Sequence, residues 1–97
     1  MADYIFTNAA VEDLSEIWNY TFDEWSESQA DKYYTLLIGF CKKISDNPKM
    51  DKNYPQVNKN IFGYRVGQHI IFYRVINSRK IEIMRILHSR MDIRTRL

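Results

Sequence analysis

Residues 61–92 constrain the fold most, because they hold three strand-like runs separated by two short turns. The first run ends at Gly67, and residues 69–76 then form a run dense in β-branched and aromatic side chains. Asn77-Ser78 supplies turn chemistry, since short polar side chains bond their own backbone and asparagine tolerates unusual backbone angles. A third run follows at residues 81–87. The stretch therefore predicts an antiparallel three-stranded meander.

The middle run is apolar on both faces, with Ile71 and Tyr73 on one side and Ile70 and Phe72 on the other. Another layer must therefore cover the sheet. In the third run, a regular strand would place Arg85 on one face together with apolar neighbours and His88 on the opposite face; these neighbours are Ile81, Ile83 and Leu87.

The first half of the chain predicts that covering layer. Residues 4–7 fit an edge strand, and Thr7 or Asn8 can cap a following helix. Apolar residues then recur at steps of three and four and form one stripe on a predicted helix: Val11, Leu14, Trp18, Phe22 and Trp25. The acidic residues of this segment, Asp13 among them, lie largely off the stripe. We expect this stripe to be core, so that alanine at Trp18 or Trp25 would cost roughly 3–5 kcal/mol.

A second helix is predicted to begin at Ser26, because Ser26-Glu27-Ser28-Gln29 has the spacing of a capping box. Its apolar period continues to Asn47-Pro48, where proline ends it. Two helices joined by almost no linker form a hairpin, and residues 48–60 read as a polar loop. The predicted fold class is α+β, in the order β-α-α-β-β-β, with the helix hairpin on one face of a small antiparallel sheet.

Length and composition favour one domain, residues 1–97, without disulfides. Cys41 is the single cysteine, and the chain opens on no signal-peptide pattern, so a cytoplasmic setting is expected. No apolar run approaches a membrane span, and no membrane association is expected. His69 and His88 lie far apart in sequence with no cysteine cluster, so neither a metal nor another cofactor is expected.

The charge is asymmetric. Residues 1–47 carry nine acidic residues and three lysines, a net charge of −6, whereas residues 48–97 carry eleven basic and three acidic residues, a net charge of +8. A basic half can meet nucleic acid, an acidic helix of a partner or an acidic groove on a target, and charge alone does not choose among them.

An ordered set of residues spanning about Tyr4 to Asp92 resembles the ParE toxins of the RelE/ParE superfamily. It comprises Ile17-Trp18-x-Tyr20-Thr21, Trp25 with Gln29-Ala30 and Tyr33, Gly63-Tyr64-Arg65, His69-x-Ile71-Phe72-Tyr73-Arg74-Val75, and Ile83-x-Arg85-Ile86-Leu87-His88-x-x-Met91-Asp92. The resemblance implies the toxin of a bacterial type II toxin–antitoxin module, which inhibits DNA gyrase and is neutralised by a ParD-like antitoxin. It also implies that operator DNA is bound only through the toxin–antitoxin complex.

The resemblance implies action by binding, with no catalytic residue. By resemblance and charge, the residues expected to bind the target are Arg65, Arg85, His88, Arg90, Met91 and Asp92. Alanine at Arg85 or His88 is expected to reduce toxicity without unfolding the chain.

The alternative is a RelE-type ribosome-dependent mRNA endonuclease, since the same fold hosts both activities. Cleavage through the 2′-hydroxyl needs a general base, a general acid and cations at the phosphate, and Arg65, Arg85 and His88 are the catalytic candidates. RelE-type enzymes often carry a tyrosine close to the C-terminus, and this chain has no tyrosine after Tyr73. The resemblance therefore favours gyrase inhibition.

Overall fold

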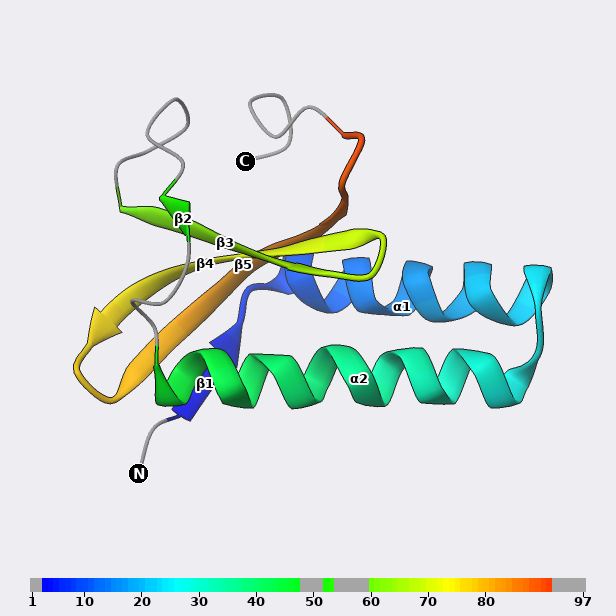
Figure 1. The fold of residues 1–97 in the computed structure, drawn as a ribbon, viewed down its shortest axis with the longest axis horizontal. Helices are drawn as coiled ribbons and strands as arrows, with labels where there is room; N and C mark the ends of the chain where they lie inside the picture. The colour runs from blue at the N-terminus through cyan, green and yellow to red at the C-terminus, as the bar shows by residue number, and fades with distance from the viewer. Residues whose placement is uncertain (1–2, 48–51, 54–59, 92–97) are drawn as a thin grey trace.

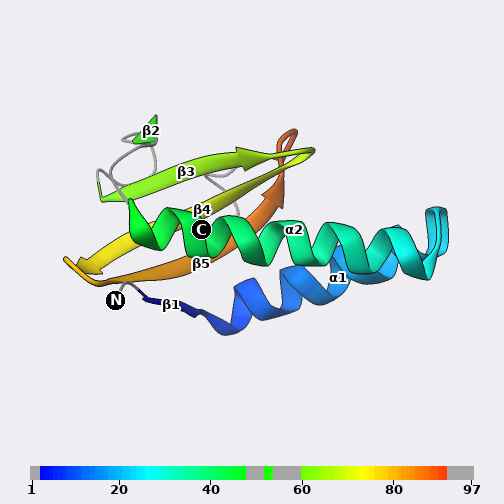
Figure 2. The ribbon, with the colours of Figure 1, turned by 60° about the horizontal axis from the view of Figure 1, so that its bottom comes forward.

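A five-stranded sheet forms one layer of the molecule and a helix hairpin forms the other (Figures 1 and 2). The computed structural model describes residues 3–47, 52–53 and 60–91. In chain order the elements are β1 (Asp3–Phe6), α1 (Asn8–Glu24), α2 (Glu27–Asp46), β2 (Lys52–Asn53), β3 (Ile61–Val66), β4 (His69–Asn77) and β5 (Lys80–His88). The predicted order of elements is confirmed, with β2 as a two-residue addition inside the predicted loop.

Strands β3, β4 and β5 form the predicted antiparallel meander, within a sheet ordered β1-β5-β4-β3-β2. The first turn depends on Gly67, whose φ of 57° lies in the left-handed region that favours glycine. The second turn lies one residue later than predicted, because Asn77 still belongs to β4. Its side-chain oxygen accepts a hydrogen bond from the backbone N–H of Arg79 at 2.8 Å, as an asparagine before a turn commonly does.

Strand β1 is the predicted edge strand, but it runs parallel to β5, so the sheet is mixed rather than wholly antiparallel. Tyr4 pairs with Ile81 and Phe6 pairs with Ile83. After Phe6 the chain leaves the sheet and enters α1, whose first turns continue along the same edge of β5. The backbone N–H of Thr7 donates to Ile83, and its hydroxyl donates to the carbonyl of Met84 at 2.7 Å.

Both helices begin at the predicted caps. The Thr7 side chain accepts from the backbone N–H of Ala10, and the Ser26 side chain accepts from that of Gln29, each at 3.1 Å. These bonds satisfy backbone donors that have no partner within the helix. With 17 and 20 residues, the helices extend for about 25 and 30 Å at the usual rise per residue.

The main core lies between the sheet and the parts of the helices nearest to it. Its buried members are Ala10, Leu14, Leu37, Cys41 and Ile44 from the helices and Val66, Ile71, Tyr73, Ile81, Ile83 and Ile86 from the strands. The other face of the sheet carries a smaller buried cluster of Ile61, Phe72 and Leu87. The helix hairpin thus covers one of the two apolar faces predicted for β4.

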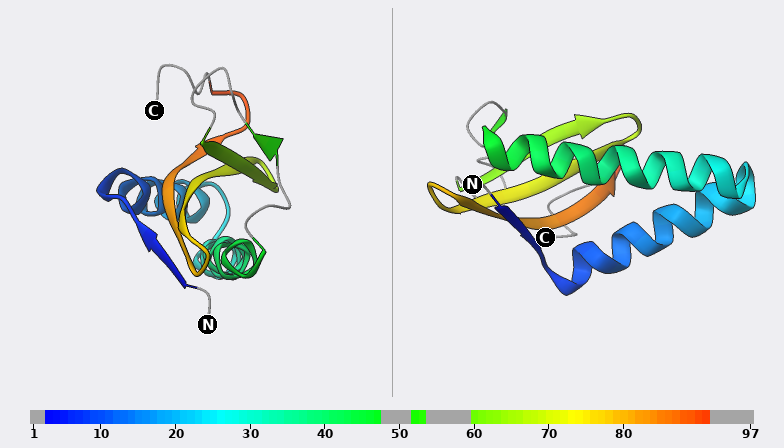
Figure 3. Two further views of the ribbon diagram at one scale, coloured as in Figure 1. Left: turned by 90° about the vertical axis from the view of Figure 1, so that its left-hand side faces the viewer. Right: turned by 90° about the horizontal axis from the view of Figure 1, so that it is seen from below.

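The prediction that the apolar stripe of α1 belongs to the core is wrong for most of its members. Leu14 is buried, but Val11, Phe22 and Trp25 are 51%, 45% and 75% exposed. Trp18 is half-buried; its ring stacks on Phe22 with centroids 5.3 Å apart, and its indole N–H donates to Asp31. The reason is visible in Figures 1 and 3, where the far half of the hairpin extends past the sheet.

The prediction for Arg85 holds in part: it shares a face with Leu87, opposite His88, but not with Ile81 and Ile83, because β5 carries a bulge. Phe72 pairs with Arg85 and Tyr73 pairs with Ile83, so Met84 has no partner on β4. One extra residue reverses the alternation of side chains along a strand. Consequently Ile81 and Ile83 belong to the helix-side core whereas Leu87 belongs to the cluster on the other face.

Candidate functional site

A groove of about 820 Å³ opens between the overhanging helix hairpin and the end of β5. Five sections of the chain contribute its walls. They are α1 (Asp13, Glu16, Ile17, Tyr20 and Thr21), the helix turn (Trp25), α2 (Gln29 and Tyr33), the β3–β4 turn with the first residue of β4 (Gln68 and His69), and β5 with the turn after it (Arg85, Ile86, Leu87, His88 and Met91).

The groove walls expose large apolar side chains. Tyr20 is 66% exposed, and Trp25 and Met91 are 75% and 44% exposed, although all three line a concave surface. Exposed aromatic and methionine side chains around a hollow are typical of surfaces that bind another protein. Glu16 adds an acidic side chain to this lining. The groove therefore suits an apolar segment more than a highly charged one.

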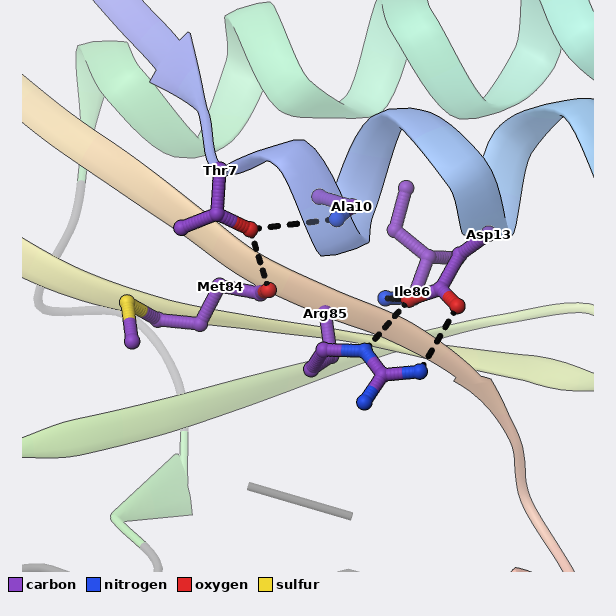
Figure 4. Close-up of polar contacts among 6 residues, drawn as sticks. All are labelled: Thr7, Ala10, Asp13, Met84, Arg85 and Ile86. Atoms are coloured by element: carbon purple, nitrogen blue, oxygen red, sulfur yellow. Dashed lines mark hydrogen bonds and ion pairs between the residues drawn. The ribbon is translucent and has the colours of Figure 1, made fainter.

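Asp13 and Arg85 form a clamp at one side of the groove (Figure 4). The Asp13 carboxylate accepts two bonds from the Arg85 guanidinium, both at 2.8 Å, and a third from the backbone N–H of Ile86 at 3.0 Å. Asp13 is only 6% exposed, although its position off the apolar stripe predicted an outward-facing side chain. These hydrogen bonds raise the pKa of Arg85, and they anchor α1 to β5 just beyond the end of β1.

Tyr33, His69 and His88 contribute polar groups to the groove. The Tyr33 hydroxyl donates to the carbonyl of Val66 at 3.2 Å and lies 2.7 Å from Nδ1 of His69. His69 and His88 are opposite each other on β4 and β5, with ring centroids 5.6 Å apart. The pKa of His69 is lowered to about 4, mainly by burial and also by the neighbouring His88, while Asp13 acts in the opposite direction.

The structure brings together only some of the predicted site residues. Arg85, His88 and Met91 line the groove, and exposed Arg90 donates its backbone N–H to Nδ1 of His88 at 3.1 Å. Arg65 does not join them: it pairs with Ile70, whereas His88 pairs with His69, the next residue along β4. Because neighbouring positions of a strand face opposite sides, Arg65 and His88 project from opposite faces of the sheet. Asp92 lies outside the described residues.

Tyr20, Trp25, Tyr33 and His69 are groove residues that the sequence did not single out as functional. Trp25 continued an apolar helical stripe, which gives no sign that the neighbouring layer ends before it. Tyr33 follows the apolar period of α2, which does not distinguish a groove residue from a core residue. The one available signal was the concentration of aromatic residues around Trp25, since aromatic residues are enriched at protein–protein interfaces.

The described part of the chain offers neither a metal cluster nor a membrane helix. Within residues 3–47, 52–53 and 60–91, no three side chains of histidine, cysteine, aspartate or glutamate are gathered to hold a metal ion. Neither α1 nor α2, the helices of that part, is long and apolar enough to span a membrane.

Comparison with known proteins identifies the family. A sequence profile described as the ParE toxin of the type II toxin–antitoxin system parDE matches residues 4–93. The chain belongs to the ParE toxin family. Toxin ParE1 of Mycobacterium tuberculosis is 32% identical to it over 90 residues, which cover 93% of this chain and 92% of that protein. The resemblance drawn from the sequence is thus confirmed.

Solved structures share the fold. A chain of the chromosomal ParDE toxin–antitoxin system of P. aeruginosa superposes with a TM-score of 0.75 at 18% identity, covering 91% of this chain and 96% of that one. A chain of the toxin–antitoxin complex RelBE2 of Mycobacterium tuberculosis does so with a TM-score of 0.70 at 19% identity, covering 91% and 98%. ParE-family toxins therefore share this fold with a RelBE system, and the fold alone does not identify the target of the toxin.

Proposed function

We propose that this ParE-family toxin acts in the cytoplasm by binding and inhibiting DNA gyrase. We further propose that a segment of a ParD-like antitoxin neutralises it by occupying the groove. The observation that carries the proposal is the groove itself, an apolar hollow bordered by exposed Tyr20, Trp25 and Met91. A hollow of this kind accommodates the apolar side of an amphipathic segment.

Binding is favoured over RNA cleavage by the positions of the candidate catalytic residues. A nuclease needs its base, acid and cations around one phosphate. Arg65 and His88 project from opposite faces of the sheet, and two hydrogen bonds hold the Arg85 guanidinium on Asp13. These three residues would have to rearrange substantially to act on one phosphate.

The charge of α1 also disfavours RNA in the groove. Glu16 lines it, and Glu12, Asp23 and Glu24 are exposed elsewhere on the same helix. These carboxylates would repel a phosphate backbone, whereas lysine or arginine side chains at the edge of a peptide would be attracted.

The gyrase-contacting surface is proposed at the end of β5 and the turn after it. Arg90 and Met91 are exposed there, next to His88. Arg65 extends this proposed surface on the far side of the sheet, and Arg85 contributes by holding the end of β5 in place. Asp92 completes the set expected from the sequence. In this arrangement an antitoxin in the groove contacts His88 and Met91, so antitoxin and gyrase would compete for them. Operator DNA would be bound only by the toxin–antitoxin complex.

Two purified assays run side by side test the proposal. The first adds the protein to gyrase and relaxed plasmid and measures supercoiling and cleaved plasmid; the second adds it to ribosomes translating a defined message. Loss of supercoiling with an intact message supports gyrase inhibition. Message cleavage with unaffected gyrase would refute it in favour of the endonuclease.

A matched pair of arginine variants tests the proposed contact surface. Arg90→Ala should weaken inhibition of supercoiling, whereas Arg79→Ala should not. Arg79 is also exposed but lies in the β4–β5 turn, at the opposite end of β5. If both substitutions weaken inhibition of supercoiling equally, the inhibition depends on the overall positive charge of the protein and not on a contact at Arg90.

A further inference from the structure

Two histidines line the groove, and the hydrogen bonds around them determine which of their ring nitrogens donate and which accept. His69 and His88 face each other across adjacent strands, their rings nearly perpendicular at 76°. Both residues line the groove. A neutral imidazole has one nitrogen that donates and one that accepts, so the tautomer decides what each ring offers to a bound molecule.

The tautomer of His88 follows from its contact with Arg90. The backbone N–H of Arg90 lies 3.1 Å from Nδ1 of His88, and a backbone N–H can only donate. Nδ1 is therefore the acceptor. Neutral His88 must carry its proton on Nε2, which is a donor.

The tautomer of His69 follows from its contact with Tyr33. The Tyr33 hydroxyl is 3.2 Å from the carbonyl of Val66 and 2.7 Å from Nδ1 of His69. A carbonyl can only accept, and a hydroxyl has one proton to give. Both contacts are hydrogen bonds only if the hydroxyl donates to Val66 and Nδ1–H of His69 donates to the hydroxyl. Nε2 of His69 is then an acceptor, and the lowered pKa of His69 keeps the ring neutral near pH 7.

The two Nε2 atoms are exposed to solvent, on rings that both line the groove. Neither has a hydrogen-bond partner among the residues that the structure describes, and no buried side-chain nitrogen or oxygen in that part of the chain lacks a partner. Each Nε2 atom is therefore in contact with solvent. The groove thus presents a donor on β5 beside an acceptor on β4.

We propose that the His69–His88 pair binds a primary carboxamide, the side chain of an asparagine or glutamine in the antitoxin segment that occupies the groove. This inference rests on the proposed function. The carboxamide oxygen accepts from Nε2–H of His88, and its NH₂ group donates to Nε2 of His69. The pair therefore determines which side chain the groove accepts. In largely apolar surroundings, a donor or acceptor left without a partner lowers the binding affinity.

Most other polar groups of a peptide do not match this pair; a hydroxyl also donates and accepts, but it does so through a single oxygen atom. A carboxylate only accepts and an ammonium group only donates, so each satisfies one histidine at most. A trans peptide unit has both a donor and an acceptor, but its N–H and C=O point in opposite directions. A primary carboxamide has an N–H on the same side as its oxygen. Some nucleobase edges share this pattern, but the acidic side chain of Glu16 in the lining disfavours a nucleotide.

The first test measures the tautomers and the chemistry of recognition directly. Long-range ¹H–¹⁵N NMR on histidine-labelled protein should find the proton of His69 on Nδ1 and that of His88 on Nε2. Propionamide should then shift both Nε2 resonances, whereas propionate and N-methylacetamide should not shift both. The opposite tautomer at either residue, or stronger shifts with cytidine monophosphate than with propionamide, would overturn the proposal.

The second test uses the complex with a co-expressed ParD-like antitoxin. Each asparagine and glutamine of the antitoxin is replaced by leucine, and affinity is measured for the unmodified toxin and for His69→Phe and His88→Phe. One antitoxin position should lose roughly 10- to 100-fold in affinity with the unmodified toxin and far less with either variant. Circular dichroism checks that both variants fold.

Trp25→Ala separates failure of this inference from failure of the proposed function. If no asparagine or glutamine is coupled to the histidines but Trp25→Ala weakens the complex, the antitoxin binds the groove and the carboxamide proposal is wrong. If Trp25→Ala also leaves the affinity unchanged, the antitoxin does not occupy the groove, and both that part of the proposed function and the carboxamide proposal fail.

Discussion

Replacing Asp13 by alanine should destabilise the protein more than any other change to an acidic side chain of α1. Asp13 is 6% exposed and accepts three hydrogen bonds, two from Arg85 and one from the backbone of Ile86. The substitution removes both bonds to the guanidinium of Arg85, whose side chain is 22% exposed, and it leaves the Ile86 N–H without this acceptor. Removing one partner of a buried ion pair lowers the free energy of unfolding by about 3–5 kcal/mol. Partial exposure of Arg85 reduces this, so we expect a loss of about 3 kcal/mol.

Urea titration followed by far-UV circular dichroism measures this loss, provided that the slope of unfolding free energy against urea is unchanged. A loss of this size would lower Tm by about 12–24 °C in a domain of this length. Glu16→Ala is the matched control, because Glu16 is an exposed carboxylate one turn further along α1 and its loss should stay within about 0.5 kcal/mol. If the two variants are equally stable, the clamp does not stabilise the fold.

The double variant Asp13→Ala with Arg85→Ala isolates the interaction between the two side chains. The combined loss should be smaller than the sum of the single losses by about 2 kcal/mol, since the pair can be broken only once. Reduced toxicity of Arg85→Ala must therefore be read together with its stability. Additive losses would show that the two side chains act independently.

Three further predictions follow from the same structure. Trp25→Ala should leave Tm nearly unchanged, because the side chain is 75% exposed, while isothermal titration should record at least tenfold weaker antitoxin binding; a large fall in Tm would mean that Trp25 is core after all. Gly39→Ala should raise the unfolding free energy by about 0.5–1 kcal/mol in urea titration, because glycine weakens a helix interior and a Cβ there would meet nothing within 4 Å; any loss of stability contradicts this. Unfolding free energy should fall as pH drops from 6.5 to about 4 and then level off, because unfolded His69 gains a proton while folded His69 stays neutral. After allowance for solvent screening the loss is about 1–2 kcal/mol, and equilibrium unfolding of His69→Phe should lack it.

The sequence predicted the elements of this fold because their signals are local. Gly67 and Asn77 mark turns of the meander, and Thr7 and Ser26 cap the helices through contacts only three residues away. Such interactions are complete within a few residues and need no knowledge of the tertiary structure.

The groove could not be predicted in the same way, because it depends on where one layer ends relative to another. The period that includes Leu14 and Trp25 shows that α1 has an apolar face, but it does not show that the sheet stops before Trp25. Asp13 resembles its acidic neighbours until Arg85 is placed opposite it. The bulge at Met84, which decides that placement, leaves no mark in the alternation of an apolar strand.

The pairing of β1 and α1 with β5 has a consequence for the kinetics of folding. The helix hairpin and the β3–β4–β5 meander each form from neighbouring parts of the chain, whereas the Asp13–Arg85 contact joins residues 72 positions apart. Closing so long a loop costs chain entropy, so we expect this contact to form after the main folding barrier. Asp13→Ala should then accelerate unfolding while leaving the refolding rate almost unchanged, with a φ-value near zero. The clamp would thus set the lifetime of the folded toxin rather than the speed at which it forms.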